Sequence, residues 1–362
     1  MDPRLEPLVD KLPAWLLPGG PESDVVVASR VRLARNLAGR RFPKLLAVEE
    51  AREICQLARD RVARFFEGGA VLEANGLARP DQDLLVERSL ATRDLLEALR
   101  PTLVFFNQEE SVGLLVNEED HFRVQAFASG LNLQVALRSA KPLAQALASR
   151  FPLARSARYG WLTACPTNTG TGLRASLLIH LPALARARTP LQRMLQAAQK
   201  SSLAVRGVHG EGSQALGHMY QISNQRTLGT DLAAQLQQVE EFGVQVASYE
   251  REVRRAMLRE ETGRRAFLAD VESAYASLRE EPGIATSEAL KMLSTLRLAQ
   301  LTGVGKELGI DLDPVVLLTD SFQIQPGHLQ ARIGAELDPD QRDASRAKLL
   351  RRSLGLPPDA ES

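Results

Sequence analysis

The hydrophobic pattern of the 362-residue chain changes at about residue 231, and this change limits the fold classes open to it. Before that point, short apolar or alternating segments are separated by glycine, asparagine or proline, which is typical of β-strands; they read GLLVN, FRVQAFA, GWLTAC, ASLLIHL and HMYQIS. After it, apolar residues recur every three or four positions among charged ones, as in amphipathic helices. The sequence therefore predicts an α+β fold with an antiparallel sheet flanked by helices, and then an all-helical domain. The expected divisions are an N-terminal extension at 1–20, the α+β domain at 21–230 and the helical domain at 231–355.

Helical stretches also occur between the predicted strands of the first domain. The segments PKLLAVEEAREICQLARDRVARFF, KPLAQALASRF and TPLQRMLQAAQKSS carry apolar residues at helical spacing. The run VVVASRVRLARN begins with β-branched residues, Val25 to Val27, which predict a strand. The alternating basic residues that follow predict an exposed turn after this strand.

Net charge and cysteine content exclude several classes of protein. The formal net charge of +1 argues against a polyanion-binding surface over the whole chain, so direct nucleic-acid binding is not expected, although a local basic cleft is compatible with it. Two cysteines, Cys55 and Cys165, are too few for a disulfide framework or a four-cysteine zinc site. No apolar run approaches the roughly 20 residues that span a bilayer. We therefore expect a cytoplasmic protein that makes no membrane contact.

The usual phosphate-binding loops are missing from the sequence. No GxxxxGK[ST] loop is present, and the nearest piece, GVGKE at 303–307, lacks both the spacing and the hydroxyl residue. No GxGxxG opens a helix after a strand, and the HRD and DFG motifs of protein kinases are absent as well. Any nucleotide would have to be bound by a different arrangement of residues.

Five arginines at strand ends and glycine-rich loops offer such an arrangement. Arg30 and Arg32 alternate, so in an extended strand both side chains point the same way. Arg123 follows an acidic cluster, Arg174 closes the loop CPTNTGTGLR, and Arg206 opens RGVHGEG. Guanidinium groups grip phosphate oxygens in bidentate fashion, and loop glycines would let backbone amides approach a ligand. Because 38 of the 45 basic residues are arginine, a solvated surface role stays open for each one alone.

The segment NEEDHFR at 117–123 has two interpretations from its residues alone. It could be a polar turn between strands, in which Asp120 or His121 caps backbone groups. It could also be part of a catalytic site, in which one carboxylate acts as a base or an orienting group while Arg123 binds a phosphoryl group.

Four blocks of sequence, taken together, resemble the phosphagen (guanidino) kinases. They are, in order, SRVRLARN, NEEDHFR, CPTNTGTGLRAS and RGVHGEGS…YQISNQRTLG, and the resemblance runs from about residue 20 to 230. Two features are similar to the bacterial branch that phosphorylates arginine side chains of proteins. Fewer than 30 residues precede Arg30, where the small-molecule kinases carry a helical domain, and the tail contains RDASRA at 342–347.

The resemblance implies an ATP-dependent, Mg²⁺-requiring kinase that has no metal ligands of its own. Glu119 matches the catalytic base, Glu211 matches a second carboxylate that grips the guanidinium, and Cys165 matches a reactive cysteine. A base is needed because a guanidinium is protonated and delocalised at neutral pH. The implied nucleotide-binding residues are Ala28, Ser29, Arg30, Val31, Arg32, Arg123, Arg174, Ala175, Ser176, Leu177, Leu178, Arg206, Gly207, Val208, His209, Gly210 and Glu211. Ser89, Leu178 and Gln221 depart from the pattern of the creatine kinase branch, which leaves the adenine contacts open.

The resemblance also implies regulation and partners. The RDxxRA motif is expected to form an allosteric pocket for phosphoarginine from Arg342, Asp343, Arg346 and Ala347. Expected partners are proteins with exposed arginines, a zinc-binding activator protein, a Clp-type unfoldase or protease that acts on marked proteins under stress, and a second copy of the chain. Two alternatives remain: a kinase for free arginine or another small guanidino compound, and a non-catalytic adaptor that binds phosphoarginine.

Overall fold

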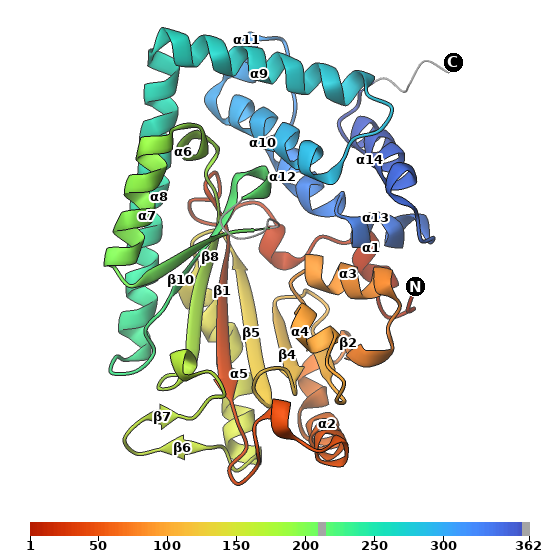
Figure 1. Cartoon of the computed structure of the whole chain (residues 1–362), viewed down its shortest axis with the longest axis vertical. Coiled ribbons are helices and arrows are strands. Elements are labelled where there is room, and N and C mark those ends of the chain that lie inside the picture. The colour runs from red at the N-terminus through yellow and green to blue at the C-terminus, as the bar shows by residue number, and fades with distance from the viewer. Residues whose placement is uncertain (209–214, 357–362) are drawn as a thin grey trace.

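An antiparallel sheet of eight strands forms the centre of the computed structural model, which describes residues 1–208 and 215–356 (Figure 1). The strand order is β2-β3-β4-β5-β1-β8-β10-β9. The strands are β1 Val26–Arg35, β2 Ala70–Glu73, β3 Leu103–Phe106, β4 Val112–Val116, β5 Phe122–Ser129, β8 Leu173–His180, β9 Leu203–Gly207 and β10 Met219–Asn224. A separate hairpin pairs β6 Arg155–Ser156 with β7 Gly160–Trp161. The predicted antiparallel sheet is confirmed.

The central strand β1 is longer than the sequence indicated. It continues through the basic run to Arg35 and pairs with β5 on one side and β8 on the other. Val31 and Leu33 point into the apolar core, whereas Arg30 and Arg32 point to the opposite face and are half-buried. The predicted exposed turn is therefore wrong: the basic residues are an alternating strand, and the apolar residues between them supply the buried face.

Helices cover one face of this sheet and leave the other partly open (Figure 1). The covering helices are α2 Val48–Val62, α5 Leu133–Arg150, α7 Arg188–Lys200 and α8 Leu232–Arg259. They share one hydrophobic core with the sheet, which includes Phe122, Val124 and Leu177. The long helix α8 belongs to this core through Leu236, Val239 and Phe242, so it packs with the sheet although it lies beyond residue 230.

The rest of the C-terminal region is helical, as predicted, and has a core of its own around Phe267, Leu296 and Leu350. It contains α9 Glu261–Glu280, α10 Thr286–Thr302, α11 Val304–Glu307, α12 Pro314–Gln323, α13 Pro326–Ile333 and α14 Pro339–Ser353. Short helices elsewhere are α1 Glu6–Asp10, α3 Arg79–Glu87, α4 Arg93–Leu96 and α6 Pro182–Arg186. Single 3₁₀ turns lie at η1 Ala14–Leu16, η2 Pro43–Leu45, η3 Ala63–Phe66, η4 Ala74–Gly76, η5 Pro166–Asn168 and η6 Leu216–His218. Within 1–208 and 215–356, no helix has the length and apolar character needed to cross a membrane.

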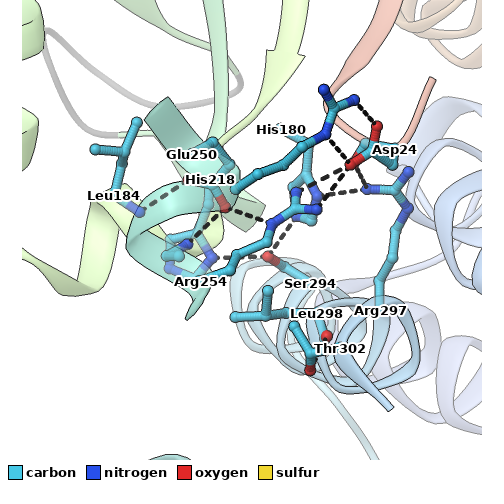
Figure 2. A network of polar contacts seen from close by, with 12 residues as sticks. Asp24, His180, Leu184, His218, Glu250, Arg254, Ser294, Arg297, Leu298 and Thr302 are labelled. Atoms are coloured by element: carbon cyan, nitrogen blue, oxygen red, sulfur yellow. Dashed lines mark hydrogen bonds and ion pairs between the residues drawn. The ribbon is translucent and has the colours of Figure 1, made fainter. Parts of the chain in front are cut away.

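A buried polar network joins the sheet to the C-terminal helices (Figure 2). Arg297 of α10 donates to Nδ1 of His180 at 2.6 Å, so the other nitrogen of His180, Nε2, must donate to the Ser294 hydroxyl at 2.7 Å. Ser294 then donates to Nδ1 of His218 at 2.7 Å. Burial lowers the pKa of His218 to about 4, and burial beside Arg297 lowers the pKa of His180 well below its usual value. Both rings are therefore neutral in the folded protein.

Ion pairs extend this junction to the N-terminal end of β1. Arg254 of α8 pairs with Glu250 at 3.0 Å and with Asp24 at 2.9 Å. The Glu250 carboxylate also accepts the backbone amides of Ala183 and Leu184 at the start of α6. Nearly every polar group in the junction thus has a partner inside the protein, which fixes α8 and α10 against the sheet.

A second contact between the two regions joins α3 to α13. The Glu87 carboxylate accepts the backbone amides of Gly327 and His328 at 2.7 and 2.8 Å. A Cβ at Gly327 would lie 2.4 Å from the backbone nitrogen of Leu84, so only glycine permits this approach. The C-terminal region therefore reaches the segment that leads directly into the cleft described below.

Candidate functional site

Strand pairing brings the basic residues of β1, β5, β8 and β9 to the open face of the sheet. Residues directly opposite in an antiparallel pair point to the same face. Arg32 lies opposite Gln125 on one side and opposite Arg174 on the other. In the next rows, Arg30 lies opposite Ser176, and Arg206 lies opposite Gln221. The arginines come from separate parts of the chain, so only the sheet unites them.

This face forms the floor of a cleft of about 640 Å³. Four of the five arginines expected from sequence line it, and Arg30 lies beneath, with its guanidinium 5.0 Å from the centre of the Phe127 ring and donating to the Gln125 side chain. The lining residues are Arg32, Ala34, Lys44, Thr92, Arg93, Asp94, Glu97, Arg100, Glu118, Glu119, Arg123, Asn168, Gly172, Arg174 and Arg206. The structure therefore brings the predicted basic and acidic residues together in one cavity.

The cleft arginines repel one another and lack full hydrogen bonding. Burial, and then the charge of Arg123, lowers the pKa of Arg30 to about 10. Burial and the charges of Arg30, Arg123 and Arg174 lower the pKa of Arg32, although a guanidinium stays protonated at neutral pH. The Nε donors of Arg30, Arg32 and Arg174 are buried without a partner among the described residues. Such a group of unpaired donors fits the oxygens of a polyphosphate.

The two glutamates of NEEDHFR have different environments. Glu118 is buried, with its side chain 4% exposed; it accepts from Arg123 at 2.7 Å and from the Thr92 hydroxyl at 2.8 Å. Glu119 has 32% of its side chain exposed, lines the cleft, and takes one bond of 2.8 Å from Arg123. Glu118 thus holds Arg123 in place, and Glu119 is the carboxylate that a second molecule in the cleft could reach.

The remaining residues of that segment support its backbone. Asn117 has a left-handed backbone, with φ at +59°, and its buried amide donates to the carbonyls of Ala51 and Pro101. Asp120 accepts from Asn36 and from the Ala164 amide at 2.6 and 2.7 Å, and burial raises its pKa. His121 accepts from the Leu37 amide, and burial lowers its pKa to about 4. The polar-turn interpretation therefore holds for these three residues, and Glu119 differs from them because it lines the cleft.

The loop between β7 and β8 has tightly packed glycines. Gly170 has φ at +116°, and a Cβ there would lie 2.2 Å from the Thr227 carbonyl oxygen. Its amide donates to the Trp161 carbonyl at 3.1 Å, so the expectation that this amide would face a ligand is not borne out. Gly172 and Asn168 do line the cleft. Cys165 is half-buried, and its sulfur lies 2.9 Å from the Thr167 hydroxyl.

Several other expected nucleotide-binding residues are not among those that line the cleft. Val31, Ala175 and Leu177 are fully buried in the core beneath the sheet. The Ser29 hydroxyl donates to the Gly130 carbonyl at 2.8 Å, within the fold. Ala28, Leu178 and Val208 belong to an apolar cluster with Trp15, and Ser176 and Gly207 lie on strands β8 and β9. His209, Gly210 and Glu211 lie outside the described residues.

Leu178, one of the positions that put adenine binding in doubt, belongs to this cluster. Leu178 lies opposite Gln221 in the sheet, one row beyond Ser176. Ser89 has φ at +59°, and its carbonyl accepts from the Gln125 side chain at 3.2 Å. Trp15, Ala28 and Phe127 of this cluster are buried, and Leu318 and Phe322 of α12 pack on it.

Sequence reasoning missed the residues of the cleft wall that come from the segment around α4. Arg93 and Arg100 add positive charge, Asp94 and Glu97 add negative charge, and Lys44 of η2 adds a further positive charge from another part of the chain. Arg100 donates to the carbonyls of Asn117 and Glu118, far along the chain. No local pattern marks these positions, because the pairing of distant segments creates the wall.

In the C-terminal motif RDASRA, the two arginines differ in accessibility. Arg346 is fully buried and donates to the Ile324 and Ile284 carbonyls at 3.1 and 2.6 Å, and to Asp343 at 2.6 Å. Arg342 is partly exposed and donates to the Leu337 carbonyl at 3.0 Å. Ala347 is buried in the helical core. The structure thus leaves Arg342 and Asp343 near the surface and commits Arg346 to the fold.

The part of the chain that the structure describes contains no group of three or more histidine, cysteine, aspartate or glutamate residues that could hold a metal ion. The two cleft glutamates already accept from Arg123. A magnesium ion in this cleft would therefore need most of its oxygen ligands from nucleotide phosphates and water, which is an ordinary environment for this ion.

Two family models match the sequence. The model described as the C-terminal catalytic domain of ATP:guanido phosphotransferases matches residues 53–253. The model described as the C-terminal domain of protein-arginine kinase McsB matches residues 264–362.

Curated relatives match the chain over nearly its whole length. A protein-arginine kinase of Shouchella clausii is 38% identical over 359 residues, covering 96% of this chain and 97% of its own length. One of Halothermothrix orenii is 36% identical and covers 97% of this chain and 99% of its own.

Solved structures agree with the fold. A duplicated taurocyamine kinase of Schistosoma mansoni is 25% identical with a TM-score of 0.55; the match covers 65% of this chain and 35% of that one. A lombricine kinase is 21% identical with a TM-score of 0.57, and the match covers 68% of this chain and 71% of that one.

Proposed function

This chain belongs to the ATP:guanido phosphotransferase family, and from that premise we propose that it is an ATP-dependent protein arginine kinase. The main support for this proposal is the cleft, where Glu119 lines the same cavity as Arg32, Arg123, Arg174 and Arg206. The full-length similarity to relatives named protein-arginine kinase supports an arginine side chain as the acceptor.

The row of arginines would bind the phosphates of ATP. Arg32 and Arg174 lie side by side in the sheet, and their unpaired Nε donors need acceptors. Phosphate oxygens would supply those acceptors and would also relieve the repulsion between the guanidinium groups. During transfer the same donors would stabilise charge as it moves from the γ-phosphate to the leaving ADP. Mg²⁺ bound by the nucleotide would neutralise part of that charge.

Glu119 would act on the acceptor. The acceptor guanidinium must lose a proton before a nitrogen can attack, because its lone pairs are delocalised. Glu119 would orient the planar group and take this proton, while the nitrogen forms a bond to the γ-phosphorus and the bond from that phosphorus to the bridging oxygen breaks. Glu118 cannot take this role while Arg123 and Thr92 occupy it. Glu211 and Cys165 remain proposed contributors to acceptor binding.

The reaction class and the acceptor can be tested in one experiment. Purified protein is incubated with ATP, Mg²⁺ and an unfolded arginine-rich protein, and parallel samples receive free arginine. We expect label on the protein that is lost in acid, because a phosphoramidate bond is acid-labile. An acid-stable label would overturn the reaction type, and transfer to free arginine without transfer to protein would establish the small-guanidine alternative.

The C-terminal region supports a second, linked proposal. Arg342 and Asp343 lie near the surface of α14 and offer a cation for a phosphate and a carboxylate for a guanidinium, so they would bind phosphoarginine. Arg346 and Ala347 would support that pocket from within the helical core. The non-catalytic adaptor alternative rests on the same residues, and it would gain if Glu119→Ala left the cellular function unchanged.

The wider setting is proposed from family resemblance. It comprises a cytoplasmic enzyme that acts as a homodimer, a zinc-binding activator protein, and delivery of marked proteins to a Clp-type protease under stress. Size measurement of the purified protein and activity with and without the activator would test the dimer and the activator separately.

A further inference from the structure

A second basic cavity lies at the β6–β7 hairpin. Its volume is about 860 Å³, larger than the cleft, and it is lined by Arg35, Arg155, Arg158, Tyr159 and Trp161 together with backbone of the 227–232 segment. The nucleotide cleft and this cavity share the 165–172 loop as a wall, since Asn168 and Gly172 face the cleft while Gly170 and Thr171 face the cavity.

Ion pairs do not neutralise the three arginines of this cavity in the part of the chain that the structure describes. Neither Arg35 nor Arg155 nor Arg158 forms an ion pair with any carboxylate in 1–208 and 215–356. The one acidic residue of the lining, Asp231, caps the start of α8 by accepting the Ala234 amide at 2.8 Å. Arg35 is only 7% exposed, and the charge of Asp120 acts on it without forming an ion pair, so its burial is costly.

Aromatic rings hold these guanidinium groups in place without using their donors. The centre of the Trp161 ring lies 4.3 Å from the Arg35 guanidinium carbon and 5.3 Å from that of Arg155, and Arg158 stacks on Tyr159 at 5.0 Å. Stacking leaves the N–H groups at the edge of a guanidinium free to donate. One nitrogen of the Arg35 guanidinium donates to the Ala34 carbonyl at 2.6 Å. The others can meet a ligand.

We propose that this cavity binds the phosphate group of a second ligand, separate from the nucleotide in the cleft. Guanidinium edges fixed by aromatic rings suit a tetrahedral dianion, which accepts several charge-assisted hydrogen bonds at once. The cavity is much larger than a phosphate ion, so it has room for the side chain that carries the phosphate. The ligand chemistry is a phosphoryl group, which either a phosphorylated arginine side chain or free inorganic phosphate can supply. The site does not depend on the proposed kinase reaction.

The chain has two tryptophans, and this makes a direct test available. In a Trp15→Phe background, Trp161 becomes the sole tryptophan and lies inside the cavity. Its fluorescence is titrated at constant ionic strength with inorganic phosphate, phosphoarginine, ATP and a single-stranded oligonucleotide. We expect a saturable response to the first two. Tighter binding of phosphoarginine would assign the site to a phosphorylated side chain, and equal binding would assign it to the free anion.

Three variants decide where the response originates. Arg155→Gln is expected to weaken phosphate binding about tenfold or more. Arg52→Gln removes an exposed arginine of α2 that lines neither cavity, and should change nothing. Arg206→Gln alters the cleft alone and should also leave the Trp161 response intact.

Other outcomes would overturn the proposal. These are no saturable response, an equal response in Arg155→Gln, loss of the response in Arg206→Gln, a response to ATP alone, or tighter binding of the oligonucleotide than of phosphate. If Trp15→Phe does not fold, calorimetric titration of the unmodified protein and of Arg155→Gln with phosphate gives the same decision.

Discussion

Arginine has opposite uses in the cleft and in the C-terminal helices. In the cleft, Arg30, Arg32 and Arg174 lie close together with buried Nε donors that find no partner in the described chain. In the helical region, Arg346 is more deeply buried, yet two carbonyls and Asp343 accept its hydrogen bonds. Arg297 of α10 also has a buried Nε without a partner among the described residues, so an unmet donor indicates ligand binding only where the arginine lines an open cavity, as Arg32 and Arg174 do in the cleft.

Glu119→Gln should have the largest effect on the cleft. The amide keeps the shape of the side chain but cannot accept a proton, so kcat should fall by about 10²–10⁴-fold while the Kd for ATP stays within about threefold. Steady-state kinetics and calorimetry measure the two quantities. Glu97→Gln, on the exposed cleft wall, is the matched control and should keep activity. Activity of Glu119→Gln above about a tenth of normal would contradict the base assignment.

Arg346→Gln should affect stability and leave nucleotide binding unchanged. It strands the Ile284 and Ile324 carbonyls and the Asp343 carboxylate, which should cost about 3 kcal/mol of unfolding free energy. Urea denaturation monitors this, with the partly exposed Arg342→Gln expected to cost less than about 1 kcal/mol. If the two variants were equally stable, the comparison between the regions would fail.

Arg32→Gln should weaken nucleotide binding without a loss of stability, which is the reverse of what we expect for Arg346→Gln. Removal of one phosphate ligand should weaken ATP binding by about 10–100-fold. Because Arg32 is repelled by Arg30, Arg123 and Arg174, the free energy of unfolding without nucleotide should stay the same or rise. Calorimetric titration and urea unfolding of one preparation give both numbers. A stability loss of more than about 1 kcal/mol would mean that Arg32 is a structural residue.

Arg342→Ala tests whether the tail contains a binding residue at all. Phosphoarginine binding should weaken about tenfold with stability nearly unchanged, since this arginine has a single carbonyl partner. The exposed Arg352→Ala on the same helix is the control. Asp343 should stay intact in this test, because its removal would also leave Arg346 without its carboxylate. Unchanged binding would remove Arg342 from the proposed pocket.

Acid should destabilise the junction, and this is the smallest of the expected effects. His180 and His218 are neutral in the fold, and their pKa values lie below the usual 6.5, at about 4 for His218. As the pH falls below 6.5 the unfolded chain binds protons that the folded chain does not, so stability is lost toward acid and restored above 6.5. Each such histidine contributes at most about 1.4 kcal/mol per pH unit.

Urea unfolding between pH 5 and 7 measures this slope. The slope of the unfolding free energy against pH reports how many protons the chain takes up on unfolding. His218→Gln should lower that number by about one. Arg32→Gln should leave it unchanged, because the cleft arginines do not titrate in this range. An unaltered slope in His218→Gln would show that this ring is not held neutral in the junction.

The sequence predicted the architecture from periodicity and predicted the cleft from resemblance. The strands GLLVN and FRVQAFA lie where alternation indicated, as β4 and β5. The convergence of Arg32, Arg123, Arg174 and Arg206 could not follow from spacing, because the residues that pair with β1 lie far from it in the chain, as Phe122 does from Arg35 and Ile179 from Val26. The prediction that these residues share one site came from the resemblance to the phosphagen kinases.

Other features were hidden from the sequence for physical reasons. The basic run after Val27 was expected to be exposed because charged side chains usually are, and a ligand-binding face is the exception to that rule. Arg100 and Thr92 line the cleft and form hydrogen bonds to Glu118 or its backbone, which no local sequence pattern indicates. Arg346 was expected at a binding surface, and the helical core that buries it forms from residues spread over 267–356.

The alternation of Arg30, Val31, Arg32 and Leu33 along the central strand also bears on how the chain folds. Side chains in a strand repeat every two residues, so a slip of one position would turn both guanidinium groups into the apolar core and expose Val31 and Leu33. Burying two unpaired charges is far more costly than any pairing gained. The arginines that face the cleft therefore also destabilise a sheet in which β1 is shifted by one residue. The correct register of β1 is favoured before any ligand is present.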